Sequence, residues 1–410
     1  MDIADVALGD LLQSAHLAAQ HHLPALITRC ATAMGAQSIV IYLVDLQQQV
    51  LVPFVEPEDA GDTSLAPLSV DATLAGRAFQ NVEVHVQEIG AESIRLLLPL
   101  LDGSERLGVL AVTISPPELL TAEGSPLEER LRRLASLASE LLVTKTSYGD
   151  TLVRLRRREP MTLAAEMQWS LLPPLTFACE AVTIAAALEP AYSVAGDTID
   201  YSVDAGITRL AIFDGMGHGL QSGQLAALAV GAYRHSRRAG RSLTDTVIDI
   251  DAALESGFGG DVFATALIAE LDTDTGLLRW VNAGHPAPLL LLRAGRWVKS
   301  LEVEPVPPLG LGYLGDTADL TVGSEQLEPA DRVLLYTDGV IEARSPEGDF
   351  FGLNRLVDLV GRHLLSGLPP PETTRRVAHA LLAHQQAQLT DDATLMLLEW
   401  HSGTGQRMLP

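Results

Sequence analysis

The sequence predicts an α+β protein built of two domains that are joined by helices. Its 410 residues exceed the usual size of one hydrophobic core. A hydrophobic content of 47% is enough for two packed cores. Short apolar runs typical of strands also alternate with stretches of helical spacing, both before residue 118 and after residue 180.

Charge and cysteine content exclude several classes of protein. The 28 basic and 52 acidic residues give a formal charge of -24, which argues against a nucleic-acid surface and suits a protein that binds cations. Cys30 and Cys179 are too far apart in sequence to indicate a disulfide framework or a zinc site. The acidic start MDIADVALGD is unlike a signal peptide, and no run approaches the roughly 20 apolar residues that span a bilayer. We expect a cytoplasmic protein that binds neither nucleic acid nor membrane.

The first predicted domain covers residues 1–122. Apolar side chains over residues 10–35 are spaced as in an amphipathic helix that ends near Gly35. Strand-like runs follow, and they read SIVIYLVD, QVLVPFV, RLLLPLL and RLGVLAVTI. This order predicts an α+β module.

A helical linker is predicted over residues 123–175. A long helix begins at Pro126, and a shorter one, in MTLAAEMQWSLLPP, lies between Pro160 and Pro173. The long helix can be read as a heptad repeat, either paired between two subunits or lying on its own domain. The two sets of seam positions hold Leu127, Leu134, Leu141, Tyr148 and Leu155, and Leu131, Ala138, Lys145 and Leu152.

Acidic residues stand at the ends of several predicted strands in the third region, residues 176–402, which precedes a tail at 403–410. Strand ends fix the position of a carboxylate better than loop tips do. One acidic residue follows the predicted strand TRLAIF, and another follows RVLLYT. Two acidic residues precede ATLMLLEW, and the segment AGDTIDY contains two more. These residues are Asp214, Asp338, Asp391, Asp392, Asp197 and Asp200.

The acidic strand ends predict a metal site. Taken singly, an Asp-Gly pair can simply mark a turn. Taken together, so many carboxylates in one domain would repel one another unless cations lay between them. Oxygen ligands select Mg²⁺ or Mn²⁺ over zinc, and two such ions could lower the pKa of a shared water for attack on phosphorus.

The stretch AIFDGMGHGL gives the glycines near Asp214 a function. Gly215 has no side chain, so its carbonyl could approach an ion as a ligand. Gly217 and Gly219 allow a sharp turn into the next helix. His218 could donate a proton to a leaving group, or it could only form local hydrogen bonds.

Six blocks between residues 160 and 400 resemble the stage II sporulation protein E-type serine phosphatases, the bacterial branch of the metal-dependent (PPM) protein phosphatases. The blocks occur in the family's order: AEMQWSLLPP, AYSVAGDTIDY, AIFDGMGHGL, FATALIAELDTDTGLLRWVNAGHPAPLLL with PPLGL, DRVLLYTDGVIEAR and DDATLMLL. The resemblance implies an α-β-β-α sandwich with two Mn²⁺ or Mg²⁺ ions at one end.

The resemblance also implies roles for the acidic residues. Asp214 matches the carboxylate that bridges both ions, with the Gly215 carbonyl on one of them. Asp338 and Asp391 match ligands of the other ion, and Asp197 matches a position that binds through water. Further neighbours of the site would be Asp200, His218 and Asp392, while the NAGHP segment matches a structural turn containing Asn282, Gly284 and His285.

The sequence departs from the family beside Asp197. The family usually has an aromatic residue at Thr198 and two glycines where this chain has Ala195 and Gly196. No motif arginine clearly holds the phosphate. These differences motivate an alternative, a phosphatase-like module that binds phosphoproteins without turnover.

The first 145 residues resemble a GAF sensory domain. The similarity lies in SVDATLAGRAFQNVEVHV and in LLLPLLDGSERLGVLAV. Together the two resemblances imply a serine/threonine phosphatase that acts on a phosphorylated anti-sigma-factor antagonist. Its regulator would be a small-molecule or protein signal at the GAF-like domain, and the heptad predicts a homodimer.

Overall fold

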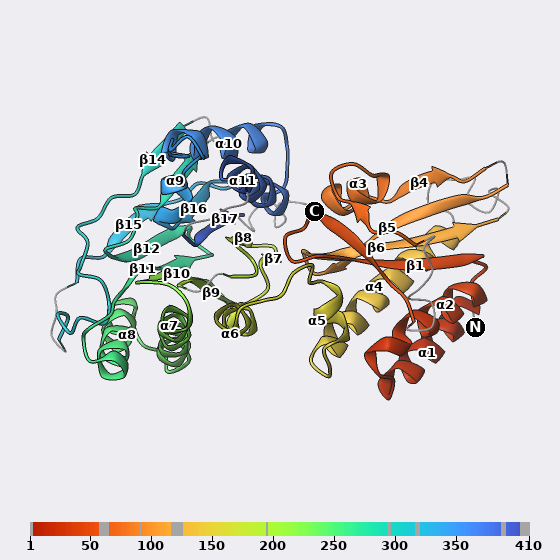
Figure 1. Cartoon of the computed structure of the whole chain (residues 1–410), viewed down its shortest axis with the longest axis horizontal. Helices are drawn as coiled ribbons and strands as arrows, with labels where there is room; N and C mark the ends of the chain where they lie inside the picture. The colour runs from red at the N-terminus through yellow and green to blue at the C-terminus, as the bar shows by residue number, and fades with distance from the viewer. Residues whose placement is uncertain are drawn as a thin grey trace. The chain divides into compact units, whose positions relative to one another are not determined.

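The structure is a computed structural model, and it describes residues 3–56, 65–90, 92–115, 126–193, 196–292, 297–315, 320–386 and 391–401. The chain divides into two compact units, an N-terminal unit of residues 1–159 and a C-terminal unit of residues 160–410 (Figure 1). Each unit has its own hydrophobic cores. Ala195, the tail 403–410 and the predicted boundary at residue 122 lie outside the described residues.

The N-terminal unit contains one antiparallel sheet with the strand order β3-β2-β1-β6-β5-β4. Its long central hairpin, β5 and β6, has register partners from Ile94↔Ile114 to Asp102↔Glu105. The strands are β1 (Ser38–Val44), β2 (Val50–Phe54), β3 (Leu68–Ser69), β4 (His85–Glu88), β5 (Ile94–Asp102) and β6 (Glu105–Ile114).

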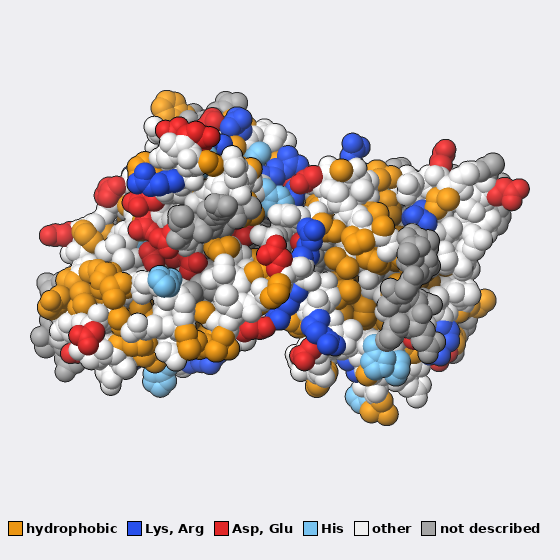
Figure 2. All heavy atoms as spheres, viewed as in Figure 1, with side chains coloured by type: hydrophobic (Ala, Val, Ile, Leu, Met, Phe, Trp, Pro, Cys, Tyr) orange, Lys and Arg blue, Asp and Glu red, His pale blue; other side chains and the backbone are white. Residues whose placement is uncertain are grey.

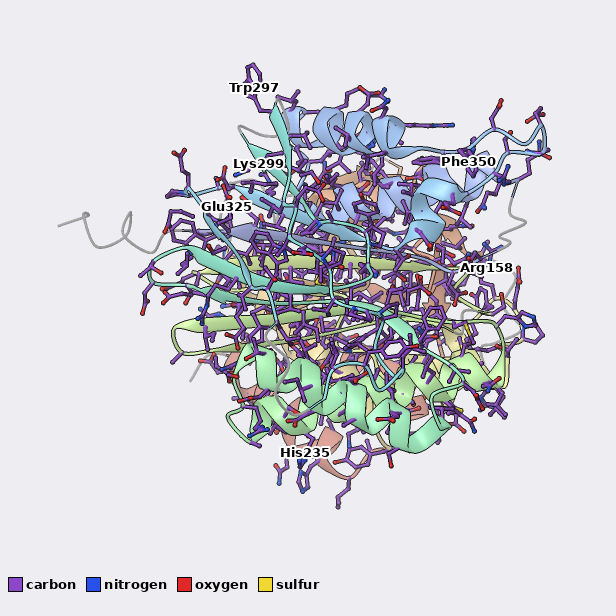
Figure 3. The ribbon with its side chains drawn as sticks, turned by 90° about the vertical axis from the view of Figure 1, so that its left-hand side faces the viewer. Arg158, His235, Trp297, Lys299, Glu325 and Phe350 are labelled. Atoms are coloured by element: carbon purple, nitrogen blue, oxygen red, sulfur yellow. The ribbon has the colours of Figure 1, made fainter. Side chains whose placement is uncertain are left out.

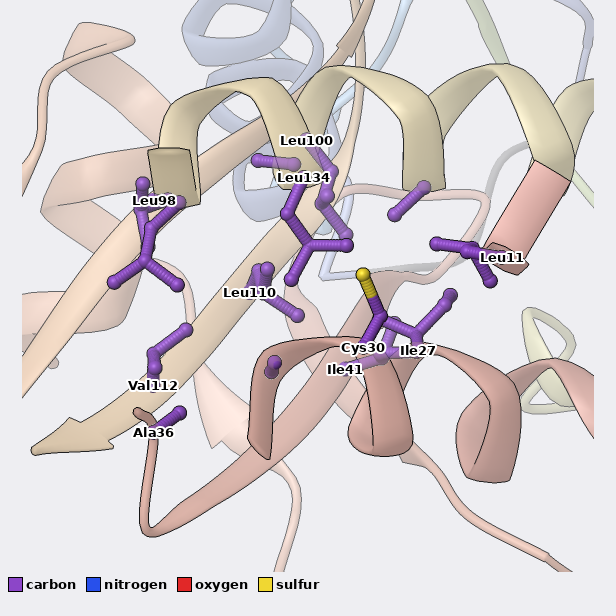
Figure 4. Close-up of a cluster of buried hydrophobic side chains, with 14 of the residues drawn as sticks. Leu11, Ile27, Cys30, Ala36, Ile41, Leu98, Leu100, Leu110, Val112 and Leu134 are labelled. Atoms are coloured by element: carbon purple, nitrogen blue, oxygen red, sulfur yellow. The ribbon is translucent and has the colours of Figure 1, made fainter. Parts of the chain in front are cut away.

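Helices cover both faces of this sheet. On one face, α1, α2 and α4 enclose a core that includes Cys30, as Figure 4 shows. Burial, and secondarily the charge of Asp10, raise the pKa of the Cys30 thiol to about 11, so this cysteine is a packing residue. On the other face α3 packs on the sheet, with its Phe79 in one buried cluster with Tyr42 of β1. The helices are α1 (Ile3–His16), η1 (Gln20–His22, a 3₁₀ turn), α2 (Leu23–Ala33), α3 (Leu74–Asn81), α4 (Pro126–Thr146) and α5 (Thr151–Leu155).

The predicted linker helix α4 is part of the N-terminal unit. Of its seam residues, Leu131, Leu134 and Ala138 are fully buried in the core beneath it. Tyr148 is the exposed exception. A helix packed on its own sheet shows the same three- and four-residue spacing as a coiled-coil seam. The structure therefore corrects the paired-helix interpretation, and this seam does not support the predicted homodimer.

The C-terminal unit stacks two antiparallel sheets. One has the order β15-β12-β11-β10-β9 and the other the order β14-β13-β16-β17-β8-β7. Their strands are β7 (Thr176–Ala178), β8 (Val182–Glu189), β9 (Asp197–Asp204), β10 (Ile207–Gly215), β11 (Ala264–Asp272), β12 (Leu277–Ala283), β13 (Leu289–Leu292), β14 (Trp297–Ser300), β15 (Gly323–Gln326), β16 (Arg332–Tyr336) and β17 (Ala393–Trp400).

Helices form the outer layers, as the α-β-β-α prediction requires. A core that includes Ile212 and Met396 lies between the sheets. Helices α7 and α8 cover the five-stranded sheet, and α9, α10 and α11 cover the other (Figure 1). The shorter α6 packs beside α7 and so belongs to this unit. The helices are α6 (Leu163–Leu171), α7 (Leu220–Arg238), α8 (Leu243–Phe258), α9 (Asp338–Glu342), α10 (Leu353–Leu365) and α11 (Pro370–His384).

An ion pair connects the two sheets at one edge. Lys299 Nζ on β14 lies 2.7 Å from Glu325 Oε2 on β15. Figure 3 shows the two side chains along one side of the unit, with Phe350 on the opposite side. Among the described residues, no helix has the length and apolarity needed to cross a membrane.

Candidate metal centre

Two acidic residues face each other where β9 begins and β10 ends. Asp197 opens β9, and its partner in the antiparallel register is Asp214, the next-to-last residue of β10. Directly opposed residues have Cβ atoms about 4.5–5.5 Å apart, and like charges in this arrangement destabilise a sheet. The register thus places two carboxylates close enough to repel each other and destabilise the sheet, unless a cation neutralises them.

Both carboxylates belong to the side of the sheet that faces the other sheet. Side chains alternate along a strand, so residues an even number apart share a face. Ile199 on β9 and Ile212 on β10 lie in the core between the sheets. Asp197 and Asp214 are each two residues from one of them and therefore share this face.

The second sheet brings its own acidic residues to the same place. Thr337, at the end of β16, donates a hydrogen bond from its hydroxyl to Asp197 Oδ2 at 2.7 Å. Asp392, just before β17, accepts through Oδ2 from the backbone N–H of Gly196 at 2.7 Å and of Asp197 at 3.3 Å. These contacts join segments that are 140 and more residues apart in sequence.

Glycines permit this close approach of the backbone. A Cβ on Gly196 would lie 2.5 Å from the Gly215 carbonyl oxygen, and one on Gly339 would lie 1.9 Å from the Asp392 carbonyl oxygen. Real Cβ atoms do not approach oxygen this closely, so larger residues would push the segments apart. The Asp-Gly pairs at 214 and 338 thus serve the meeting of strand ends, beyond any role in a turn.

Burial and mutual repulsion raise the pKa values of the clustered carboxylates. Desolvation raises the pKa of Asp214 to about 7, with additional contributions from the charges of Asp338, Asp391 and Asp392. Burial, then the charge of Asp214, raises the pKa of Asp197 well above its ordinary value. The pKa values of Asp338 and Asp391 are raised mainly by burial as well. Figure 2 shows acidic side chains gathered on one face of this unit.

The donor set fits a hard divalent cation. Asp214 and Asp338 are close enough to share a hydrogen bond. No three Asp, Glu, His or Cys side chains of the described residues are already arranged as a ligand shell. Mg²⁺ commonly binds through one or two carboxylates and keeps several waters, so it does not need such a shell. A bound cation would reduce the electrostatic repulsion between these buried carboxylates.

Asp200 lies elsewhere, and this corrects its prediction as a neighbour of the site. It stands three positions after Asp197, an odd spacing, so it occupies the opposite face of β9. There its carboxylate pairs with Arg234 Nη2 at 2.8 Å and Arg237 Nη1 at 2.9 Å, both on α7. Arg234 also donates to the backbone carbonyl of Leu171 at the end of α6. Asp200 is therefore a structural residue that connects β9, α7 and α6.

Thr198 also belongs to the helix-covered face of β9, since it is the next residue after Asp197 and successive side chains point to opposite faces. The departure from the family pattern at this position is therefore not part of the carboxylate cluster. His218 is exposed in the turn before α7 and makes no hydrogen bond with the described residues.

The NAGHP segment forms the expected structural turn. Asn282 Nδ2 donates to the His285 carbonyl, and the His285 N–H donates to Asn282 Oδ1, each at 2.8 Å. Burial lowers the pKa of His285 to about 3, so the ring is neutral. Its Nδ1 lies 2.8 Å from the hydroxyl of Thr265, which is the register partner of Asp214 on β11. This turn thus contacts the strand that pairs with β10 beside Asp214.

Sequence reasoning missed Thr337 and Arg234. Thr337 stands directly before Asp338, so a polar residue at a strand end was a visible signal. Arg234 lies on α7, and the sequence alone does not show which side chains of this helix face β9.

Comparison with known proteins decides the family of this unit. Residues 204–401 match the family model described as Stage II sporulation protein E (SpoIIE). The C-terminal unit is a SpoIIE-family domain. The chain is 26% identical to phosphoserine phosphatase RsbU of Bacillus subtilis over 241 residues, which are 59% of this chain and 70% of RsbU.

Two further relatives are more partial. Phosphoserine phosphatase RsbP of Bacillus subtilis is 28% identical over 197 residues, which cover 46% of this chain and about half, 47%, of RsbP. A crystal structure of the RsbU and RsbW domains of Rv1364c from Mycobacterium tuberculosis is 26% identical, with a TM-score of 0.47. It covers 54% of this chain and 62% of that one.

Proposed function

We propose that this protein is a metal-dependent phosphoserine/phosphothreonine protein phosphatase whose C-terminal unit carries the active site. One observation supports it most. Asp197 and Asp214 face each other on the inner side of the sandwich, at the end where Asp338, Asp391 and Asp392 also lie. The SpoIIE family and the phosphoserine phosphatases RsbU and RsbP supply the reaction class.

Two Mn²⁺ or Mg²⁺ ions would be held by Asp214, Asp338, Asp391 and the Gly215 carbonyl, with Asp197 acting through water. When bound, the ions would supply positive charge for the phosphoryl group and lower the pKa of water. Asp392 and Thr337 would position these ligands, since they bind the backbone and the carboxylate of Asp197.

Arg344 is our candidate for the contact to the substrate's phosphoryl group. It follows α9, the helix that begins at Asp338, by two residues. Its guanidinium stacks 4.0 Å from the centroid of the half-exposed Phe350 ring. Most other basic residues in the described part of this unit are paired with carboxylates, whereas Arg344 has no acidic partner there.

The proposed substrate is a phosphorylated anti-sigma-factor antagonist, by analogy with the family. Regulation by the N-terminal unit, as a GAF-like sensor of an unknown signal, is part of the same proposal. A chain beginning at Glu159 should then differ from the full chain in activity or metal dependence. Equal activity and metal dependence would contradict the regulation and leave the phosphatase proposal standing.

The test of activity is release of phosphate from an aryl phosphate with Mn²⁺. Asp214→Asn and Asp338→Asn should lower kcat/KM by about 100-fold or more, or roughly 3 kcal/mol. Asp358→Asn is the matched control, because within the described residues Asp358 pairs with the exposed Arg362 on α10 and with no other basic side chain. Full activity in both site variants would contradict the assignment.

A non-catalytic phosphoprotein-binding module is the alternative. The observation in its favour is the lack of a preformed ligand shell among the described residues. Calorimetry showing tight binding of a phosphorylated partner, without turnover with Mn²⁺, Mg²⁺ or any other divalent ion tried, would support this alternative.

A further inference from the structure

A groove of about 690 Å³ lies in the N-terminal unit, between the end of α1, the turn η1 and the junction of α4 with α5. Volumes of 300–1,000 Å³ are typical of small-molecule sites. The lining is largely apolar, and several of its apolar residues are exposed to solvent, Leu17 at 92% and Tyr148 at 77%. The principal apolar lining residues are Leu12, Ala15, Leu17, Leu137, Leu141 and Tyr148.

A buried cation lies in this groove. Lys145 is only 8% exposed, although a lysine is ordinarily solvated. Its Nζ donates to the His16 carbonyl at 3.0 Å and lies 5.8 Å from the centroid of the Tyr148 ring. An ammonium has three protons to donate, and the other two have no acceptor among the described residues.

The ammonium also lacks a carboxylate partner in the described part of the chain. Glu140, which is exposed, is the carboxylate that lines the groove, and it forms no ion pair with Lys145. The histidines of the lining, His16 and His21, add no negative charge. Burying an unpaired charge is unfavourable, and an anion that reached Lys145 would relieve this.

The floor of the groove is the junction between α4 and α5. The buried side chain of Gln20 holds this junction, since Nε2 donates to the carbonyls of Lys145 at 2.6 Å and Gly149 at 2.8 Å. Its Oε1 accepts from the N–H groups of Thr151 at 2.9 Å and Leu152 at 3.3 Å. The groove therefore has a fixed polar floor with an apolar wall.

We propose that this groove binds a small amphipathic carboxylate, such as a medium-chain fatty acid. The carboxylate would take the free donors of Lys145, and the alkyl chain would lie along Leu12, Leu17 and Leu137. Charge complementarity favours this ligand over a neutral or cationic one of the same length. The site is independent of the metal centre, so its test does not depend on phosphatase activity.

The experiment uses the full chain labelled at its lysines, because the sequence contains only Lys145 and Lys299. Sodium decanoate, kept below its micelle concentration, should shift the Lys145 side-chain NMR signal saturably and leave the Lys299 signal unchanged. Decanol and decyltrimethylammonium, as neutral and cationic probes, should bind at least tenfold more weakly. Equal binding of the cationic probe, or no saturable shift, would overturn the proposal.

Two variants localise the site. Lys145→Met, followed by calorimetry, should weaken decanoate binding at least tenfold, and Leu17→Asp should do the same without touching the core, since Leu17 is exposed. The matched control is Arg133→Met, because Arg133 is exposed on α4 and pairs with Glu129 outside the groove. Unchanged affinity in Leu17→Asp would overturn the proposal, whether or not Lys145→Met folds.

A second copy of the chain is the competing occupant. Sedimentation velocity in the absence of decanoate distinguishes it. A monomer whose groove binds decanoate supports the proposal. A dimer that Leu17→Asp dissociates, and that does not bind decanoate, would assign the groove to contact between copies and overturn the proposal.

Discussion

Asp197 and Asp200 stand three residues apart on one strand, and each is only 1% exposed, yet their environments are opposite. Asp200 is paired with Arg234 and Arg237. Asp197 has Asp214 and Asp392 as its charged neighbours, and its pKa is raised. A buried carboxylate with cations beside it holds the fold together, whereas one with only other carboxylates beside it indicates a place for an ion from outside.

The largest expected effect on stability is at Asp200, the carboxylate that is paired with arginines. Asp200→Ala leaves two arginines, 23% and 12% exposed, without their partner in a buried place. We expect the free energy of unfolding to fall by about 3 kcal/mol, the lower end for a broken buried pair. Urea unfolding followed by tryptophan fluorescence measures this, since all four tryptophans belong to the C-terminal unit.

The control for that prediction is Asp358→Ala, which removes an ion pair whose members are 62% and 63% exposed. Exposed pairs contribute between 0 and about 1 kcal/mol. If Asp200→Ala destabilised the protein no more than this control, the contrast between the two faces of β9 would be lost.

A substitution in the carboxylate cluster around Asp197 and Asp214 should change the free energy of unfolding in the opposite direction. Asp214→Asn removes one negative charge from a buried cluster in which desolvation first, and the neighbouring carboxylates second, raise the pKa of Asp214 to about 7. Without added metal at pH 8, we expect it to increase the free energy of unfolding by at least about 1 kcal/mol, since one pKa unit corresponds to 1.36 kcal/mol. It should also abolish stabilisation by Mn²⁺. Destabilisation of the metal-free protein by this substitution would contradict the cluster's repulsion.

Much of this contrast was accessible from the sequence. The order of acidic strand ends predicted which segments meet, and the α-β-β-α sandwich followed from the resemblance. The two-residue period of a strand could have separated Asp200 from Asp197, because an odd spacing reverses the face. The hydrogen bond from Thr337 to Asp197 could not be predicted from the sequence, because it depends on how the two sheets stack. The α4 seam was misread because packing within a domain and between chains use the same spacing.

A pH titration of stability should sharpen the comparison further. The raised pKa of Asp214 means that the folded state holds its proton up to about pH 7, while the unfolded state releases it near 3.8. The folded state therefore binds more protons between these values, and the metal-free protein loses stability as pH rises from 4 to 7 and above. We expect a decrease of about 1 kcal/mol or more in the tryptophan-detected unfolding free energy.

Two comparisons accompany that titration. Asp214→Asn should show a smaller decrease over the same range, since it lacks the titrating group. Mn²⁺ should stabilise the wild-type protein more at pH 8 than at pH 5, because protons compete with the metal for the carboxylates. Stability that rose with pH in the metal-free protein would be inconsistent with carboxylates of raised pKa.

The smallest effect is expected at His218. This residue is four positions from Asp214, but its side chain is exposed and has no hydrogen-bond partner in the described part of the chain. A group that donates a proton in a transition state typically contributes 100-fold or more. Nothing orients this imidazole, so we expect His218→Ala to lower kcat/KM by at most about threefold, below 1 kcal/mol. An aryl phosphate assay with Mn²⁺ over pH 6–9 measures it, with His235→Ala on α7 as the surface control. A 100-fold loss with a changed pH profile would show instead that the turn orders around bound metal and brings His218 into the reaction.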